Sequence, residues 1–243
     1  MINLLHGDCL ELMKNIPDKS IDMVLTDPPY GTTACKWDSV IPFEPMWKEL
    51  KRITKDNGAI ALFGSEPFSS ALRISNIKEF RYDWIWNKKK AANFAQSGFQ
   101  PMKYHEIISI FYKNKSNFFH QKTIGSVVKK TSSKVQNQDR IEAGLNMPVK
   151  YSENYEPNKR LPKSIIEFSK PGGKFLHPTQ KPVSLLEYLI KTYTLENETV
   201  LDFTMGSGST GVAAKNLNRN FIGIEKDKKY FEIAKNRIEG NLK

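Results

Sequence analysis

The tetrapeptide Asp27-Pro28-Pro29-Tyr30 combines residue types that can hold a flat ring bearing an amine. The acidic side chain can accept hydrogen bonds from the amine, and the aromatic ring can stack on its face. Each proline fixes φ and lacks a backbone donor, so a neighbouring carbonyl is not drawn into a helix or ladder and can accept from a ligand. Because the tetrapeptide follows the apolar run 21–26, a Pro-Pro turn that only closes a buried strand is the alternative.

A glycine-rich segment near the other end of the chain has the pattern of a nucleotide-binding turn. Residues 200–211 read as a strand, a turn of the form G-x-G-x-x-G and the start of a helix. Such glycines let the backbone approach a phosphate at a helix N-terminus, and an acid after the next strand binds ribose hydroxyls. Glu225, after the apolar run 221–224, supplies that acid. A nicotinamide-dependent dehydrogenase therefore competes with other adenosine-binding enzymes, and a turn needed only for strand-to-helix packing is the third alternative.

Apolar periodicity predicts that these two segments share one α/β domain. Strands are expected at residues 2–5, 21–26, 59–63, 82–86, 107–112, 199–203 and 221–224. Helices are expected at residues 8–15, 45–54, 67–75, 182–194, 209–216 and 227–239. This order predicts a mostly parallel twisted sheet with helices on both faces. Only one strand follows the glycine segment, which disfavours a dehydrogenase and places Asp27 in the same sheet as the glycines.

The chain is basic, and its basic charge is concentrated in one region. Its 243 residues include 37 Lys and Arg against 26 Asp and Glu, a formal net charge of +11 that favours an anionic partner. Residues 113–174 lose the periodic pattern and hold thirteen basic residues against five acidic ones. Interleaved aromatic residues such as Phe118 and Tyr155 suit phosphate contact combined with base stacking. A solvated loop would have a similar composition.

The cysteine content gives no indication of a metal site or a disulfide framework. Cys9 and Cys35 are the two cysteines, and neither has the spacing of a metal ligand. We therefore expect a chain of the reducing cytoplasm that carries no structural zinc. No stretch approaches the roughly 18 apolar residues that a membrane span requires, so no membrane association is expected.

The motifs occur in an order that is typical of one enzyme family. Residues 27–30 come first, region 113–174 follows, and the segment His177-Pro178-Thr179-Gln180-Lys181-Pro182 and the glycine segment come last. In this order the sequence resembles the β-class DNA amino-methyltransferases, which have a circularly permuted, Rossmann-like methyltransferase fold. The resemblance covers the chain outside the insertion. It implies a catalytic domain formed by residues 1–112 and 175–243, with 113–174 as a target-recognition insertion.

The resemblance implies S-adenosylmethionine as the cofactor and no metal. Glu225 would bind the ribose hydroxyls and Asp8 would lie near the adenine. Thr179 and Lys181 would hold the methionine carboxylate. The cofactor-binding residues that it implies are Asp8, Cys9, Asp27, His177, Thr179, Lys181, Asp202, Phe203, Gly206, Ser207, Gly208, Ser209, Thr210 and Glu225. Phe203-Thr204 stands where relatives often have Pro-Phe, which leaves open which side chain packs on the cofactor.

The resemblance also implies a catalytic set, which is Asp27, Pro28, Pro29 and Tyr30. The Asp27 carboxylate and the Pro28 carbonyl would accept the two amine protons of a base that has flipped out of duplex DNA, and Tyr30 would stack on that base. Aspartate at position 27, where some relatives have serine, favours N6 of adenine over N4 of cytosine. An N4-cytosine enzyme and, from another class, a DNA-binding module without activity stay open.

The implied partners follow from the same family. Double-stranded DNA is the expected substrate, and a homodimer and a cognate restriction endonuclease are further partners that the family admits. The lysine-rich strand end 86–90 is expected near DNA, whereas Trp37, Trp84 and Trp86 are expected in the core or at its rim.

Overall fold

The computed structural model describes residues 1–32, 38–91, 93–126, 156, 158–170, 176 and 180–241. The chain divides into two compact units, Met1–Phe119 with Lys163–Lys243, and His120–Pro162. The second unit contains the antiparallel pair β6 (Thr123–Ile124) and β7 (Lys159–Arg160). It is shorter than the insertion expected at 113–174, because 113–119 and 163–170 group with the first unit. Its role in target recognition stays a prediction.

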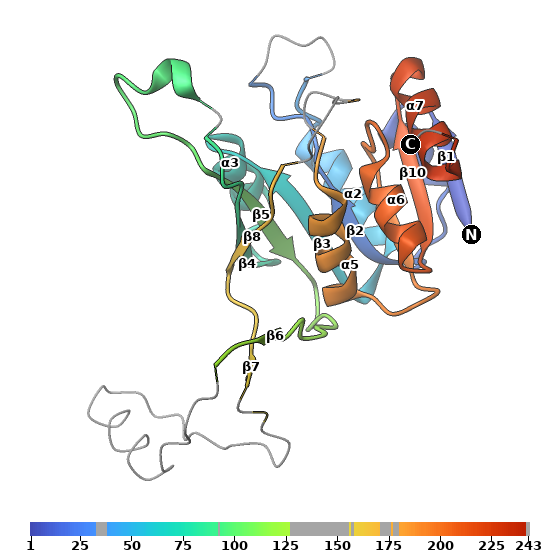
Figure 1. The fold of residues 1–243 in the computed structure, drawn as a ribbon. Coiled ribbons are helices and arrows are strands. Elements are labelled where there is room, and N and C mark those ends of the chain that lie inside the picture. Colours follow the sequence, from blue (N-terminus) through green and yellow to red (C-terminus); the bar gives the residue numbers. More distant parts are fainter. Residues whose placement is uncertain are drawn as a thin grey trace. The chain divides into compact units, whose positions relative to one another are not determined.

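One mixed sheet forms the centre of the first unit (Figure 1). Its strands are β1 (Ile2–His6), β2 (Ile21–Thr26), β3 (Thr54–Gly64), β4 (Phe80–Asn87), β5 (His105–Phe111), β8 (Ile165–Glu167), β9 (Thr199–Asp202) and β10 (Asn220–Glu225). Their spatial order is β1-β10-β9-β2-β3-β5-β4-β8. β5 runs antiparallel to both neighbours and the other pairs are parallel, so the predicted mostly parallel sheet is confirmed.

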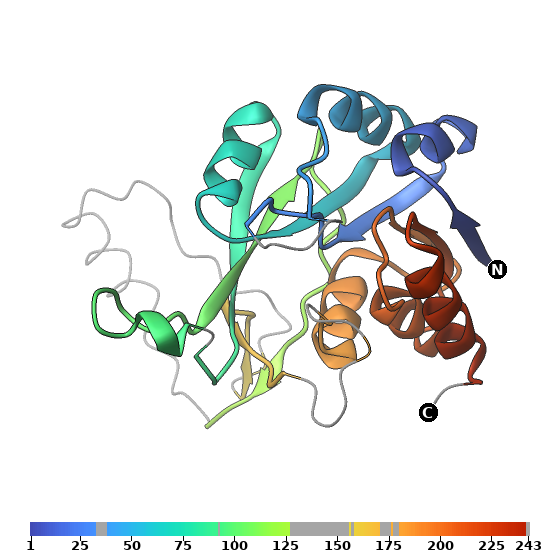
Figure 2. The same cartoon turned by 90° about the horizontal axis from the view of Figure 1, so that it is seen from above.

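Helices cover both faces of the sheet, as Figure 2 shows from above. They are α1 (Cys9–Leu12), α2 (Phe43–Ile53), α3 (Phe68–Ser75), α5 (Val183–Tyr193), α6 (Ser209–Asn216) and α7 (Lys228–Glu239), with the short 3-10 turns η1 (Met13–Asn15) and η2 (Phe94–Gln96). Asp8 caps α1 by accepting from Leu10 N, and Asp227 caps α7 by accepting from Lys229 N and Tyr230 N. The helix expected at 8–15 is split between α1 and η1.

Alternating side chains of the central strands pack into two separate cores. On β2, Met23 and Leu25 pack with α5, α6 and α7, whereas Val24 faces the core built with α1, α2 and α3. All six residues of β2 are buried, which is typical of a central parallel strand covered on both faces. Trp84 and Trp86 are buried in the first core, as predicted, and Trp37 lies outside the described residues.

The strand directions gather several chain segments at one edge of the sheet. β1, β10, β9, β2, β3 and β4 all end at this edge, because they are mutually parallel or are separated by the antiparallel β5. β5 begins there for the same reason. Ligands of open α/β sheets bind outside the carboxyl ends of the strands, so the site is expected at this edge.

Candidate active site

A pocket of about 530 Å³ opens at the carboxyl edge of the sheet. Its volume lies in the range of about 300–1,000 Å³ that is usual for small-molecule sites. The predicted site residues on its wall are Asp8, Cys9, Asp27, Pro28, Pro29, Tyr30, Lys181, Asp202, Phe203, Gly206, Ser207, Ser209, Thr210 and Glu225. The fold therefore brings the tetrapeptide and the glycine segment to one cavity.

The Asp38 carboxylate binds the backbone at the end of the tetrapeptide and just after it. Its Oδ1 accepts from Tyr30 N at 2.7 Å and Gly31 N at 2.9 Å, and its Oδ2 accepts from Thr32 N at 2.9 Å. The Tyr30 ring stacks on Phe68 with centroids 5.0 Å apart, and its hydroxyl donates to Asp27 Oδ1. The aromatic ring and the carboxylate are thus fixed relative to each other.

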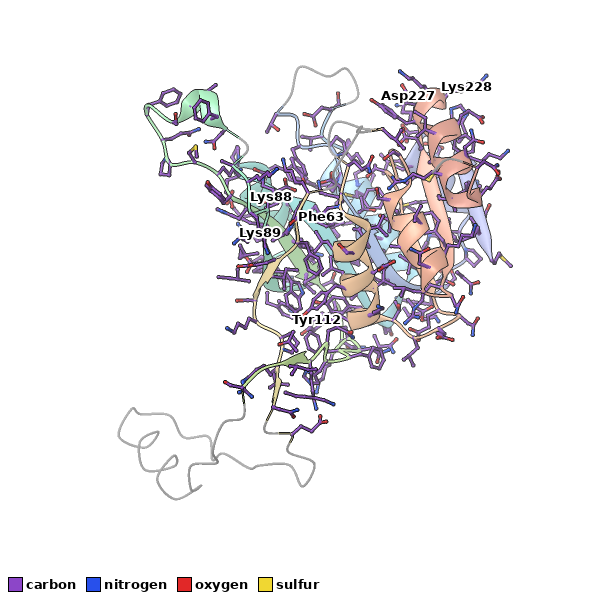
Figure 3. All side chains as sticks on the ribbon, in the orientation of Figure 1. Phe63, Lys88, Lys89, Tyr112, Asp227 and Lys228 are labelled. Atoms are coloured by element: carbon purple, nitrogen blue, oxygen red, sulfur yellow. The ribbon has the colours of Figure 1, made fainter. Side chains whose placement is uncertain are left out.

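A buried chain of alternating charges runs from Asp27 away from the pocket. Lys181 Nζ lies 2.5 Å from Asp27 Oδ2 and 3.2 Å from Glu106 Oε2, and Glu106 Oε1 lies 3.2 Å from Lys88 Nζ. Lys181 is 8% exposed and Lys88 is 2% exposed. Lys181 Nζ also lies 5.0 Å from the centre of the Phe63 ring. Figure 3 shows Phe63 and Lys88 toward the same edge of the sheet, with Tyr112 at the other end.

The charge states of these buried side chains follow from burial and pairing. Burial opposes the charge on Lys181, but Asp27 and Glu106 outweigh it and raise its pKa. Burial would raise the pKa of Glu106, but Lys181 and Lys88 outweigh it and lower that pKa. Burial raises the pKa of Asp27 and the Glu106 charge adds to the effect, although Lys181 acts against both. Burial and the neighbouring Asp27 raise the pKa of Tyr30 well above its usual value, so its hydroxyl stays a donor.

The Glu225 carboxylate holds the backbone of the glycine turn. Its Oε2 accepts from Gly206 N at 2.8 Å and its Oε1 accepts from Asp227 N at 2.8 Å. Gly208 adopts φ +78°, and a Cβ there would lie 2.9 Å from the Ala234 Cβ. Arg237 lies behind the turn and donates to the Ser207 carbonyl. The turn is therefore fixed by packing before any ligand binds.

Asp202 links the glycine turn to the end of β2. It is buried, and its Oδ1 accepts from the Thr26 hydroxyl at 2.9 Å and from Thr204 N at 3.2 Å. Burial raises the pKa of Asp202 to about 7, although these hydrogen bonds act in the opposite direction. The Thr204 hydroxyl donates to the Asp27 carbonyl at 3.2 Å. Burial likewise raises the pKa of Cys9, which also lines the pocket, to about 12.

Some predicted site residues are absent from the pocket wall, and others lie outside the residues that the structure describes. Gly208 is not on the pocket wall, because it packs against Ala234. His177 and Thr179 lie outside the described residues. Lys181 pairs with Asp27 and Glu106, and its contact with a methionine carboxylate stays a prediction. The strand end 86–90 is expected near DNA, and this stays a prediction, although the Lys88 ammonium is buried against Glu106.

Sequence reasoning missed Asp38, Glu106 and the buried role of Lys88. The roles of Glu106 and Lys88 depend on which strands meet at the edge, which the charge pattern does not indicate. Asp38 acts locally, since it accepts from the backbone of residues 30–32, but no motif in the sequence marks it. In the described part of the chain, no helix is long and apolar enough to cross a membrane.

The fold and the pocket define an α/β enzyme that binds a nucleoside cofactor at the carboxyl edge of its sheet. The family model described as DNA methylase, which covers N6 and N4 amino-methyltransferases, matches residues 21–236. The chain belongs to this family of DNA amino-methyltransferases.

Individual relatives support the same assignment. The type II methyltransferase M.HinfI of Haemophilus influenzae is 33% identical over 97% of this chain and 67% of its own length. The type II methyltransferase M1.MboII of Moraxella bovis is 31% identical over 99% of both chains. Among solved structures, the M1.HpyAVI–SAM complex matches with a TM-score of 0.67 and 28% identity over 100% of both chains. The cytosine-N4-specific PvuII methyltransferase, 17% identical over 100% of this chain and 88% of its own, shares the fold with a TM-score of 0.68.

S-adenosylmethionine is the cofactor of this enzyme. The pocket suits it, because a carboxylate stands at the end of β10 beside a glycine turn that leaves backbone close to the cavity. The same wall carries the Asp27 and Tyr30 side chains. The residues predicted to bind the cofactor and the side chains predicted to hold the amine therefore line one cavity.

Proposed function

We propose that the protein transfers a methyl group from S-adenosylmethionine to the exocyclic N6 amino group of adenine at a specific site in double-stranded DNA. The observation that carries this proposal is the shared pocket, in which Asp27 and Tyr30 line the same wall as Asp202 and Glu225. An acceptor site for an aromatic amine thus adjoins a nucleoside site. When bound, S-adenosylmethionine supplies a methyl group activated by a positively charged sulfur.

Asp27 would orient the target amine. The lone pair of an aromatic amine is delocalised into the ring, so attack requires the nitrogen to become more tetrahedral. The Asp27 carboxylate and the Pro28 carbonyl would accept the two amine protons and direct the lone pair toward the methyl group. Tyr30 and Lys181 each engage one Asp27 oxygen, and each carboxylate oxygen has a second lone pair for the amine.

The cofactor would be held by the carboxylates around the glycine turn. Glu225 would accept from the ribose hydroxyls, and Asp8 would lie near the adenine. The backbone bonds from Gly206 and Asp227 keep the Glu225 carboxylate in one orientation. Burial raises the pKa of Glu225, and those backbone donors limit the rise.

The target nucleotide would have to leave the duplex to reach Asp27, since the exocyclic nitrogen lies within the base stack. Stacking on Tyr30 would offset part of the unstacking cost of a few kcal/mol. Phe68 fixes the Tyr30 ring on one side, which supports a preformed stacking surface. Region 113–174 would supply target recognition, since it carries most of the basic excess.

Adenine is favoured over cytosine by the family resemblance at Asp27, and an N4-cytosine enzyme is the second candidate. M.HinfI and M1.MboII are both named type II methyltransferases, which supports a restriction-modification context with a cognate endonuclease. A homodimer is a further proposal.

The test is transfer of a labelled methyl group to DNA, followed by digestion and identification of the modified base. We expect N6-methyladenine. N4-methylcytosine would select the second candidate, and no transfer would indicate a DNA-binding module without activity. Asp27→Ala should abolish transfer while S-adenosylmethionine binding, measured by calorimetry, is kept. Near-normal turnover of Asp27→Ala would refute the assigned role.

A further inference from the structure

Residues 88–104, which we call the arm, connect β4 and β5 at the carboxyl edge of the sheet. In Figure 1 the arm is the green segment that carries η2 and extends away from the strands. It joins two antiparallel strands, for which a two-residue hairpin would suffice. The extra length is therefore not required by the fold.

The described arm residues form a structure held by their own hydrogen bonds. Lys88 N donates to Tyr104 O at 2.8 Å and closes the base of the arm. Asn93 bridges its two sides, because its Nδ2 donates to Pro101 O at 3.2 Å and its Oδ1 accepts from Lys103 N at 2.5 Å. The exposed side chains are thus presented on an organised backbone.

Two phenylalanines of the arm are exposed to solvent. Phe94 is 79% exposed and Phe99 is 78% exposed, and Met102 and Tyr104 beside them are also exposed. Single exposed apolar residues are common, but a cluster in one short segment indicates an interaction site. These rings contribute little to the packed core, which leaves them available to a partner.

The charge of the arm identifies the chemistry of that partner. The arm contains Lys88, Lys89, Lys90 and Lys103 and no Asp or Glu. Lys88 pairs with Glu106, and Lys89 lies 3.4 Å from Glu167 in a pair whose side chains are 53% and 57% exposed, so water screens it. No acid of the arm balances the charge of Lys90 or Lys103. Aromatic faces interleaved with lysines suit a nucleic acid, whose bases stack and whose phosphates attract cations. A second copy of a chain with net charge +11 would present like charge to this surface.

The root of the arm is connected to the acceptor site. Lys88 contacts Glu106, Glu106 contacts Lys181, and Lys181 contacts Asp27. DNA that reaches Asp27 must therefore pass close to the edge from which the arm extends.

We propose that the arm is a DNA-contacting element in which Lys89 and Lys90 bind phosphates and Phe94 and Phe99 stack on bases beside the target nucleotide. This inference rests on the proposed function and adds to it the residues that open or hold the DNA near the site. An aromatic ring that stacks on a base contributes to binding affinity, and a ring on an ordered loop suits this role.

The experiment compares Phe94→Ala/Phe99→Ala with the wild-type enzyme in binding to a duplex that carries 2-aminopurine at the target position. We expect the double variant to lose about tenfold or more in DNA affinity, since aromatic stacking is sensitive to alanine substitution. The 2-aminopurine signal of flipping should fall as well. S-adenosylmethionine affinity should not change, because neither ring lies on the pocket wall.

Two further variants serve as a matched surface control and as a test of the aromatic face. Ile77→Ala is the matched control, because Ile77 is 62% exposed and lies between α3 and β4, at the opposite edge. Phe94→Leu/Phe99→Leu keeps apolar bulk without an aromatic face, and we expect it to lose affinity like the alanine variant. It also tests the proposal if the alanine variant does not fold.

Wild-type DNA affinity in both arm variants would overturn the proposal. A change of oligomeric state with DNA affinity intact would assign the arm to contacts between copies and would also overturn it. Absence of methyl transfer by the wild-type enzyme would instead refute the proposed function, because DNA affinity is measured separately.

Discussion

Lys181→Met tests whether the buried charge chain is as strongly coupled as its distances indicate. The substitution keeps an unbranched side chain, one atom shorter than that of lysine, and removes the positive charge between Asp27 and Glu106. At 3.2 Å and an effective dielectric constant of about 20, the attraction to Glu106 alone is about 5 kcal/mol before desolvation. Desolvation cancels much of this gain. Removing Lys181 nevertheless leaves the buried Asp27 carboxylate without its cation, whereas Glu106 keeps Lys88, and breaking such a buried pair costs about 3–5 kcal/mol.

The assay is thermal unfolding followed by circular dichroism at pH 8. For a chain of this size each kcal/mol shifts Tm by about 2–4 °C, so we expect a decrease of roughly 6–20 °C. Lys226→Met is the matched control, since its pair with Asp8 is 77% and 42% exposed and is screened by water. It should change Tm little.

A second variant separates charge from packing. Adding Asp27→Asn to Lys181→Met removes the uncompensated carboxylate, and we expect part of the lost stability to return. Without Lys181 the pKa of Asp27 rises further above its unfolded value, so Lys181→Met should also regain stability as pH falls. A Lys181→Met protein with wild-type Tm, or a double variant no more stable than the single one, would refute the reasoning.

Two further predictions concern the glycine turn and Asp202. Gly208→Ala should destabilise the protein by about 1–3 kcal/mol and weaken S-adenosylmethionine binding in calorimetry, because the new Cβ would meet Ala234 at 2.9 Å on a residue with φ +78°. Tight cofactor binding by this variant would contradict the close packing. The pKa of Asp202 is raised from 3.8 to about 7, so the folded state binds the proton more tightly and stability should fall as pH rises through this window. Asp202→Asn should flatten that slope in urea unfolding, and an unchanged slope would show that another group titrates.

Local patterns were sufficient to predict most elements of the fold. The apolar run 21–26 is β2, and the helix predicted at 209–216 is α6. Both have signals within their own sequence, namely a mostly apolar run and a glycine turn that precedes a helix. The helix cap at Asp227 was predictable for the same reason, because its side chain bonds the first turn of its own helix.

The contacts of Glu106 depend on strand direction, which local patterns do not encode. Strand-helix-strand order predicts parallel strands, but no α-helix separates β4 from β5 in the described chain, so β5 returns antiparallel. A parallel β5 would have placed Glu106 at the opposite edge, far from Asp27. The buried positions of Lys88 and Lys181 follow from the same reversal, because each needs Glu106 as its partner.

The order of the motifs along the chain matters less than the hydrogen bonds that join them across the sheet edge. The Thr26 hydroxyl donates to Asp202 and accepts from Phe203 N at 3.1 Å, and Thr204 donates to the Asp27 carbonyl. These bonds join residues about 177 positions apart in sequence through adjacent strands, β2 and β9. The parallel pairing of β2 and β9 alone brings both strand ends together. A chain in which residues 27–30 precede the glycine segment can therefore build the same site as a chain with the opposite order. A permuted order therefore leaves the chemistry of the edge intact.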